Sequence, residues 1–424
     1  MNDTTEFDGG RQRLSRRTLL RAGVVAAAGV GAATYLGSRG IGALAATGPV
    51  TTKRVHLAAT DGWVSMPTGA SPVPGYWPDT LAPSPFNMYV FGFRDVTGLT
   101  TAQMMAQRGR AQISAPVLAF DQETQIEVAL TNLGLSQRPD LVDGHTMHWH
   151  GFNNAIPIFD GVPEMSASVP IGKTMTYLYR PHEPGTYMYH CHFEDVEHVQ
   201  MGMTGLLYVR PKLNKDTTAN PQGHKFVFND EATRYDREFP LFLSENMPED
   251  HWRDAHIQVS DWADYLPGFA LFNGRAYPDT IQPSFSPMGS YAAGSQGARL
   301  MYQPQGSLME CNPGETILLR IAHLGSIRHT VTVDGIPLHV VGSDASQLKG
   351  DDGHDNSYWT NSVDLGPGES RDVLFTAPSE PGTYQIYDRN FMNLSNTSGG
   401  GYGGMLTHLV VRTPANPIGP QVTV

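Results

Sequence analysis

The chain has 424 residues, a length that allows two or three domains. Its 40% hydrophobic and 17% charged residues are ordinary for a globular protein, while 45 glycines and 31 prolines favour turn-rich β architecture over helix bundles. The formal net charge of -12 argues against nucleic acid or an anionic membrane surface as a partner.

The N-terminal segment has the features of an export signal. The pair Arg16-Arg17 precedes a run of small and apolar residues, Ala22 to Ala33, and Ala43-Leu44-Ala45 offers a cleavage site. We therefore predict a twin-arginine signal peptide over residues 1–46 and a periplasmic or extracellular location. The alternative is a membrane anchor, but the apolar run is shorter than the roughly 20 residues that a membrane span needs.

Residues 47–215 have the pattern of a β-sandwich. Thr124 to Leu130 alternates between apolar and polar residues, as a half-buried strand does. Turn signals at Pro170-Ile171-Gly172 and Glu183-Pro184-Gly185 separate the later segments. Further strands are predicted at Val55 to Ala58, Met88 to Phe93, Thr174 to Tyr179 and Gly205 to Val209.

Residues 216–424 repeat this organisation. Opening strands are predicted at Arg237 to Leu243 and Leu271 to Thr280, a loop over 281–300, and a further strand at Thr316 to Ile321. Three stretches of the first half have counterparts in the second. They are Gly144 to Gly151 with Arg328 to Gly335, Glu183 to Tyr189 with Glu380 to Ile386, and Gly202-Met203 with Gly404-Met405. We infer one sandwich domain that has been duplicated.

Three soft metal ligands lie within a short segment. Cys191 is followed by His198 and Met203, and the stretch from Gly144 to Gly151 supplies His145 as a fourth ligand. A thiolate, two imidazoles and a thioether suit a blue-copper electron-transfer site. Tetrahedral zinc is the alternative metal, but a thioether is a poor zinc ligand. A disulfide with Cys311 is the other alternative for Cys191, which its histidine neighbours disfavour.

Strand parity separates the histidines into two groups. In an extended chain, His190 and His192 point away from the face that Cys191 takes. His148 and His150 likewise share a face, and His145 has the opposite parity. We therefore predict an inner group of His145, Cys191, His198 and Met203, and an outer group of His148, His150, His190 and His192 that binds further copper.

The second copy lacks most of these residues. By the repeat, His148 and His150 correspond to Thr332 and Asp334, and the run His190-Cys191-His192 corresponds to Tyr387-Asp388-Arg389. Only His329 and Met405 match their counterparts. No blue-copper site is expected in this half. Its histidines are expected to be scattered: His323, His329, His339, His354 and His408. Of these, His323, His354 and His408 are interpreted as ordinary polar residues.

The chain resembles the multicopper oxidases, the laccase-like cupredoxin family. The resemblance lies in His148-Trp149-His150-Gly151, Asp160-Gly161-Val162-Pro163-Glu164 and Gly185 to His192, followed by Gly202-Met203. The second half resembles a plastocyanin-like repeat through Asn273 to Asp279 and Leu365 to Leu374. The resemblance implies an all-β chain of two cupredoxin-like Greek-key β-sandwich domains.

The resemblance also implies roles for the residues. His145, Cys191, His198 and Met203 would bind type 1 copper, His148 type 2 copper, and His150, His190 and His192 type 3 copper. Asp160 would assist proton delivery to dioxygen. The enzyme would oxidise a phenolic, amine or metal-ion donor by one electron at a time, with dioxygen as the acceptor.

The sequence departs from this family in two ways. The interval from Cys191 to His198 is two residues longer than usual in these oxidases. A complete cluster of type 2 and type 3 copper uses eight histidines, and the chain has four in motif form. In two-domain relatives the others come from the second domain, usually that of a neighbouring subunit in a homotrimer. The cluster is therefore incomplete within this chain.

Two other functions stay open. A copper nitrite reductase-like enzyme also pairs two sandwiches, and His150 and His190 would fit two of its three histidines, but Arg389 lies where the third is expected. A blue-copper electron-transfer protein with a degenerate cluster is the second alternative. The absence of a methionine-rich segment and of a basic patch leaves the electron donor open.

Overall fold

The computed structural model describes residues 51–67, 75–152, 155–396 and 401–421. The described elements belong to the unit that begins at Thr52. The predicted signal peptide over residues 1–46 lies outside the described residues. The predicted domain boundaries at residues 47 and 216 stay predictions.

The first sandwich consists of two four-stranded sheets. One has the order β2-β1-β4-β6, and the other has the order β3-β8-β7-β5. Their strands are β1 (Thr52–Val64), β2 (Met88–Asp95), β3 (Leu118–Asp121), β4 (Gln125–Asn132), β5 (His148–His150), β6 (Thr174–Tyr179), β7 (Gly185–His190) and β8 (Thr204–Arg210).

The second sandwich has a seven-stranded sheet, β12-β11-β14-β20-β16-β17 with β18 paired to β16, and a five-stranded sheet, β13-β22-β21-β15-β19. Its strands are β11 (Arg237–Asn246), β12 (Phe269–Phe272), β13 (Met309–Cys311), β14 (Thr316–His323), β15 (His329–Val333), β16 (Leu338–Ser343), β17 (Ser346–Gln347), β18 (Tyr358–Thr360), β19 (Val363–Leu365), β20 (Ser370–Thr376), β21 (Gly382–Asp388) and β22 (Leu406–Val411). A hairpin of β9 (Lys225–Phe226) and β10 (Arg234–Tyr235) precedes them.

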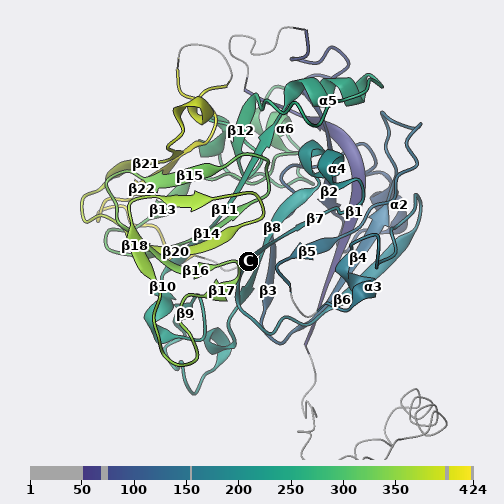
Figure 1. Cartoon of the computed structure of the whole chain (residues 1–424). Helices are drawn as coiled ribbons and strands as arrows, with labels where there is room; N and C mark the ends of the chain where they lie inside the picture. Colours follow the sequence, from purple (N-terminus) through teal and green to yellow (C-terminus); the bar gives the residue numbers. More distant parts are fainter. Residues whose placement is uncertain (1–50, 68–74, 153–154, 397–400, 422–424) are drawn as a thin grey trace, which may run out of the picture. The chain divides into compact units, whose positions relative to one another are not determined.

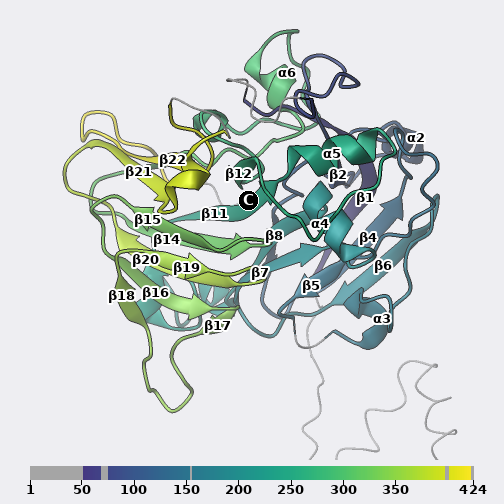
Figure 2. The same cartoon turned by 45° about the horizontal axis from the view of Figure 1, so that its top comes forward.

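The two sandwiches share one topology. β1 runs parallel to β4 as β11 runs parallel to β14, and β3 runs parallel to β8 as β13 runs parallel to β22. Figures 1 and 2 show the two sandwiches, with purple and teal strands in the first and green and yellow strands in the second. The predicted all-β class with two cupredoxin-like sandwiches is therefore confirmed, and the repeat that the sequence indicated is present in the strand order.

Alternation of side chains builds each core. In β4 the residues Ile126, Val128 and Leu130 are fully buried, whereas the residues between them are partly exposed. β6 and β7 add inward-facing tyrosines to the same core. Each sandwich has its own apolar cluster, so each supports its own loops.

Two expectations for the second half are wrong. The predicted strand from Leu271 to Thr280 ends at Phe272, because Asn273 and Gly274 both take positive φ angles, of 53° and 77°, and turn the chain. The predicted loop over 281–300 contains the short helix α6 (Gln296–Leu300), whose first turn is capped by the Ser295 side chain.

The other helical segments are short and connect strands. They are α2 (Thr101–Met105), α3 (Pro157–Asp160), α4 (Asp195–Met201), α5 (Pro248–Ala255), η1 (Lys212–Lys215), η2 (Glu231–Thr233), η3 (Asp279–Ile281) and η4 (Phe391–Leu394). Helix α5 follows β11 of the second sandwich but packs on β2 of the first, where the His251 ring lies 2.6 Å from the Tyr89 carbonyl oxygen. Helix α5 therefore connects the second sandwich to the β2 sheet of the first sandwich, which lies behind the inner histidines.

Buried charges fix β7 against the second sandwich. Arg320 is fully buried and bonds Glu238 at 2.8 Å and Asp372 at 3.1 Å. Asp372 in turn accepts a 2.6 Å hydrogen bond from the Thr186 hydroxyl of β7. Because unpaired charges in an interior are costly, this network holds β7, and with it the segment that precedes Cys191, in one position.

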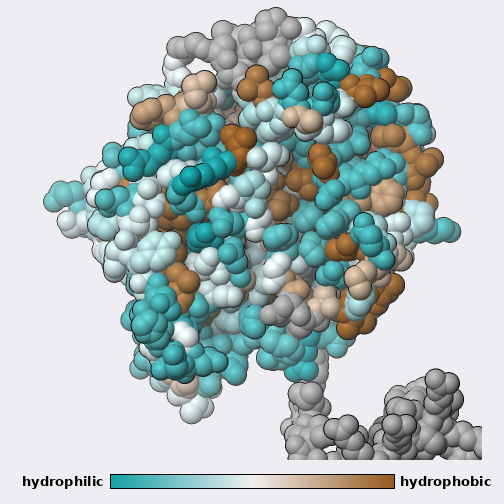
Figure 3. Space-filling view, viewed as in Figure 1, coloured by the Kyte–Doolittle hydropathy of each residue, from teal (hydrophilic) through white to brown (hydrophobic). Residues whose placement is uncertain are grey.

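Among the described residues, no helix combines the length and the apolar character that crossing a bilayer requires. The face in Figure 3 is mostly hydrophilic, with hydrophobic residues in separate small groups.

Candidate metal centre

The inner group predicted from the sequence comes together inside the first sandwich. The Cys191 sulfur lies 3.3 Å from Nδ1 of His198 and 3.8 Å from Nδ1 of His145. The three ligand atoms all lie within 4.8 Å of one another, and the three residues are at most 1% exposed. This arrangement of one sulfur and two imidazole nitrogens can enclose one metal ion.

Backbone contacts place Met203 beside the same group. The Cys191 amide donates to the Met203 carbonyl at 3.1 Å, and the Met203 amide donates to the His198 carbonyl at 2.9 Å. Met203 is fully buried. Its predecessor Gly202 has a φ of 117°, and a Cβ there would lie 2.8 Å from the Phe91 carbonyl oxygen, so this close approach requires glycine.

The long interval between Cys191 and His198 has a structural explanation. Its last residues begin helix α4 (Asp195–Met201), which is preceded by Glu194 and followed by Gly202, both in left-handed conformations. His198 lies in the last turn of α4 and points its ring toward Cys191. Helix α4 thus keeps His198 within reach of the sulfur.

The chemistry of the group fits a copper ion. Burial would raise the pKa of the Cys191 thiol, but the charge of His198 and the hydrogen bond with His145 outweigh burial and hold that pKa well below its ordinary value. The thiolate is the form that binds metal. The Thr146 amide also points at the sulfur, at 3.4 Å. A thiolate, two imidazoles and a thioether are the donor set of a blue-copper site.

The outer group also assembles. His148 of β5 pairs with His190 of β7 across the sheet, and the rings of His148, His150, His190 and His192 lie with neighbouring centroids 5.3 to 6.1 Å apart. Between the first two, Trp149 turns inward and stacks on Tyr179 at 4.1 Å, which leaves both histidines on the opposite face. The strand parity predicted from the sequence therefore places the four rings together.

Hydrogen bonds orient two of these rings. Nδ1 of His148 lies 2.6 Å from the Asp160 carbonyl oxygen, and Nδ1 of His190 lies 2.8 Å from the Cys191 carbonyl oxygen. A proton on each Nδ1 leaves Nε2 free to bind metal. Burial lowers the pKa of His148, His150 and His190, that of His190 to about 3, which favours the neutral imidazole that metals require.

The four imidazoles do not converge on one metal position. Among the described residues, they are not one of the groups whose ligand atoms lie within 4.8 Å of one another. Their spacing suits separate metal ions that share the face. The second sandwich approaches this group at Gly368, where an added Cβ would lie 3.2 Å from Cε1 of His150. Backbone, rather than a further histidine, therefore meets His150 there.

Asp160 lies at the edge of the outer group. It ends helix α3, and its carboxylate oxygen is 3.6 Å from Nδ1 of His148. Its side chain is 32% exposed, so it connects the histidines to solvent. The roles predicted for all nine site residues stay predictions, although the structure brings the residues together as the motifs imply.

Sequence reasoning missed the arrangement in the second sandwich. The expectation that its histidines are scattered is wrong for His323 and His329, whose ring centroids lie 4.9 Å apart. The structure also identifies the counterpart of His198: the Asn393 carbonyl accepts the Met405 amide as the His198 carbonyl accepts the Met203 amide. The different lengths of the two loops hide this match from the sequence.

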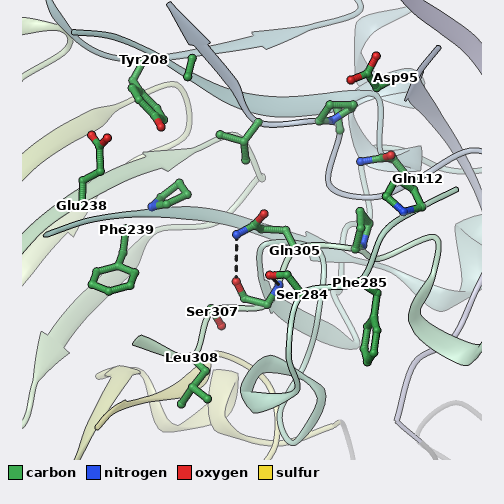
Figure 4. A pocket seen from close by; sticks show the side chains of 18 of the residues that line it. Asp95, Gln112, Tyr208, Glu238, Phe239, Ser284, Phe285, Gln305, Ser307 and Leu308 are labelled. Carbon is green, nitrogen blue, oxygen red and sulfur yellow. Dashed lines mark hydrogen bonds between the residues drawn. The ribbon is translucent and has the colours of Figure 1, made fainter. Parts of the chain in front are cut away.

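A separate cavity of about 570 Å³ is open near strands β3, β8 and β11 (Figure 4). Tyr208, Glu238, Phe239, Gln305 and Ser307 are among the side chains around it. None of the nine predicted site residues lines it. The cavity is therefore not part of the metal centre.

Fold and site together define a cupredoxin-type β-sandwich protein with a buried cysteine–histidine group that could hold a metal ion. Two sequence models described as multicopper oxidase match residues 96–214 and 248–407, together more than half of the chain. The first of these spans every predicted site residue. The chain belongs to the multicopper oxidase family.

Individual relatives agree with this family membership. Over 276 residues the chain is 29% identical to Laccase-5 of Arabidopsis thaliana, covering 64% of this chain and 40% of that protein. It is 27% identical to L-ascorbate oxidase of Brassica rapa subsp. pekinensis over 304 residues, covering 69% and 46%. The matches thus span less than half the length of these curated relatives.

Solved structures support the fold. The chain matches the blue copper oxidase from Nitrosomonas europaea with a TM-score of 0.58, 20% identity and coverage of 85% of this chain and 86% of that one. It also matches the copper nitrite reductase from Nitrosomonas europaea with a TM-score of 0.52, 16% identity and coverage of 88% and 98%. At these identities the likeness concerns the fold alone.

Proposed function

We propose that the protein is an exported laccase-like oxidase that takes single electrons from a phenolic, amine or metal-ion donor and delivers them to dioxygen. The observation that carries the proposal is the position of Cys191. Its sulfur belongs to the buried inner group, while its two chain neighbours, His190 and His192, belong to the outer group. Bonded atoms alone therefore connect the two groups.

Copper would supply one-electron redox chemistry at both groups when bound. The chain supplies everything else. The sandwich core keeps water from the sulfur, the carbonyls of Asp160 and Cys191 fix the ring orientation of His148 and His190, and Asp160 holds a carboxylate between the outer histidines and solvent. This carboxylate is placed to carry protons inward.

The comparisons favour this function over the nitrite reductase-like alternative, because both family matches are to multicopper oxidases. The arginine pair near the N-terminus supports export by the twin-arginine pathway. A homotrimer would let a neighbouring subunit complete the outer group. The electron-transfer alternative is distinguished by the number of copper ions that the chain binds.

The direct test is oxygen uptake by the purified, copper-loaded protein with a phenolic donor. We expect uptake that depends on the donor and stops when copper is removed. If the protein takes up no oxygen with a phenol, an aromatic amine or a reduced metal ion as donor, the proposal is contradicted.

Asp160→Asn should slow oxygen turnover about 100-fold, because the amide keeps the shape of the side chain but cannot carry a proton. Reduction of the inner copper by the donor, measured by bleaching in the absence of oxygen, should be unchanged. Glu164→Gln, a change at an exposed acid nearby, serves as the matched control and should leave both rates unaltered. Equal slowing of both half-reactions by Asp160→Asn would rule out a role in proton delivery.

A further inference from the structure

A second buried group of possible metal ligands lies in the second sandwich. Nε2 of His323, at the end of β14, lies 3.2 Å from the Oε1 oxygen of Glu245. Nε2 of His329, at the start of β15, contacts the same oxygen. The ligand atoms of Glu245, His323 and His329 lie within 4.8 Å of one another, and the three side chains are completely buried.

The surroundings of the group orient its members. Nδ1 of His329 lies 2.5 Å from Asp388, and the Asn393 amide donates to the same carboxylate oxygen at 2.7 Å. The second oxygen of Glu245 accepts the Ser326 amide at 2.7 Å. A histidine whose other nitrogen bonds a carboxylate is the usual arrangement of a metal-bound imidazole, because the carboxylate fixes the ring and raises its basicity.

The charges of the group also point to a cation. Glu245 and Asp388 are two buried carboxylates, and among the ion pairs of the described residues they meet only the imidazoles of His323 and His329. No lysine or arginine of that part of the chain pairs with either one. A divalent cation with neutral imidazoles balances both carboxylates.

We propose that Glu245, His323 and His329 bind a divalent metal ion of the zinc or copper type. Two imidazoles and one carboxylate are a ligand set that proteins use for zinc. The site differs from the first-sandwich site in the ring nitrogen that faces the ion. There His145 presents Nδ1 to the sulfur, whereas here Nδ1 of His329 faces Asp388, the counterpart of Cys191, and Nε2 faces the proposed ion.

The site would stabilise the second sandwich. It joins β11, β14 and β15, which belong to the two facing sheets. An ion that binds only the folded chain raises its stability. Because the ligands are fully buried, the ion has to enter while the chain folds.

The test is the metal content of the full-length protein, folded in the presence of Zn²⁺ and measured by mass spectrometry. The Cys191→Ser background is used, so that the result does not depend on the oxidase site. We expect one tightly held zinc ion per chain. Glu245→Gln and His323→Gln should lose it. His408→Gln, a change at a half-buried histidine of β22, should keep it.

A second measurement covers variants that fail to fold. The unfolding temperature of the unmutated chain should be lower when the chain is refolded with a chelator and should recover when Zn²⁺ is present during refolding. The proposal would also be supported if the chain held copper instead of zinc and Glu245→Gln removed that copper. Two results together would overturn the proposal. The folded protein would hold no zinc or copper that these substitutions remove, and its unfolding temperature would be the same with and without the chelator.

Discussion

Cys191→Ser is expected to abolish both the blue colour and the oxygen uptake of the protein. The hydroxyl of serine is not ionised near neutral pH and cannot replace the thiolate that His145 and His198 surround at 3.8 and 3.3 Å. Loss of the sulfur also removes the ligand atom at the inner end of the bonded route to His190 and His192. The measurement is the visible spectrum of the copper-loaded variant together with its oxygen uptake.

The chain offers a matched control in its only other cysteine, Cys311. Cys311 lies in β13 within the core of the second sandwich, and burial raises the pKa of its thiol to about 11. Cys311→Ser should therefore keep colour and turnover, with a loss of stability alone. A Cys191→Ser variant that stays blue, or a Cys311→Ser variant that folds but loses its colour, would contradict the assignment of the inner site.

His148→Ala is expected to separate the two groups of ligands. The variant should keep its blue colour, because His148 faces away from Cys191 and the neighbouring Trp149 still fills the core. Its oxygen uptake should fall by more than about 100-fold, since even residues that only support metal ligands change activity by that order. Reduction of the inner copper by the donor should proceed as before.

His182→Ala is the control for this prediction. His182 is an exposed histidine of the first sandwich that pairs with Glu123 outside both groups. Its replacement should change neither colour nor turnover. If His148→Ala consumed oxygen at the unmodified rate, the outer group would have no part in dioxygen reduction. If it lost its colour, the two groups would not be independent.

Local sequence patterns were sufficient to predict much of the fold and of the candidate site. The alternation of Thr124 to Leu130 predicted the strand that the structure shows as β4, and strand parity around Cys191 separated the inner from the outer histidines. These inferences succeed because they depend on neighbours along one strand. His145, which meets Val169 across an isolated bridge, was identified by its motif rather than by a strand pattern.

Contacts between distant segments could not be predicted in the same way. His323 and His329 look scattered in the sequence because Glu245, which brings them together, lies far upstream on β11. Helix α4 was hidden for another reason: the segment after Cys191 was predicted only as an enlarged loop, and its helical form depends on Glu194 and Gly202 in left-handed conformations. The sequence indicated which ligand residues lie in this segment, but it did not indicate the conformation of their backbone.

The second sandwich shows why a cysteine-centred site is predicted in one half of the chain only. Asp388 and Asn393 stand where Cys191 and His198 stand in the first, and they bond one another and His329 instead of surrounding a soft metal. The duplicated fold is kept, and the chemistry of its site has changed from sulfur to carboxylate. This difference is consistent with one inner copper site per chain.

The most direct test of the account is a count of copper ions in the purified, copper-loaded protein, made together with its visible and paramagnetic resonance spectra. We predict an intense blue absorption from the ion at Cys191 and more than one copper ion per chain, with a second cupric signal that disappears in His148→Ala. A colourless protein, or a blue protein that holds a single copper ion and no second signal, would contradict it.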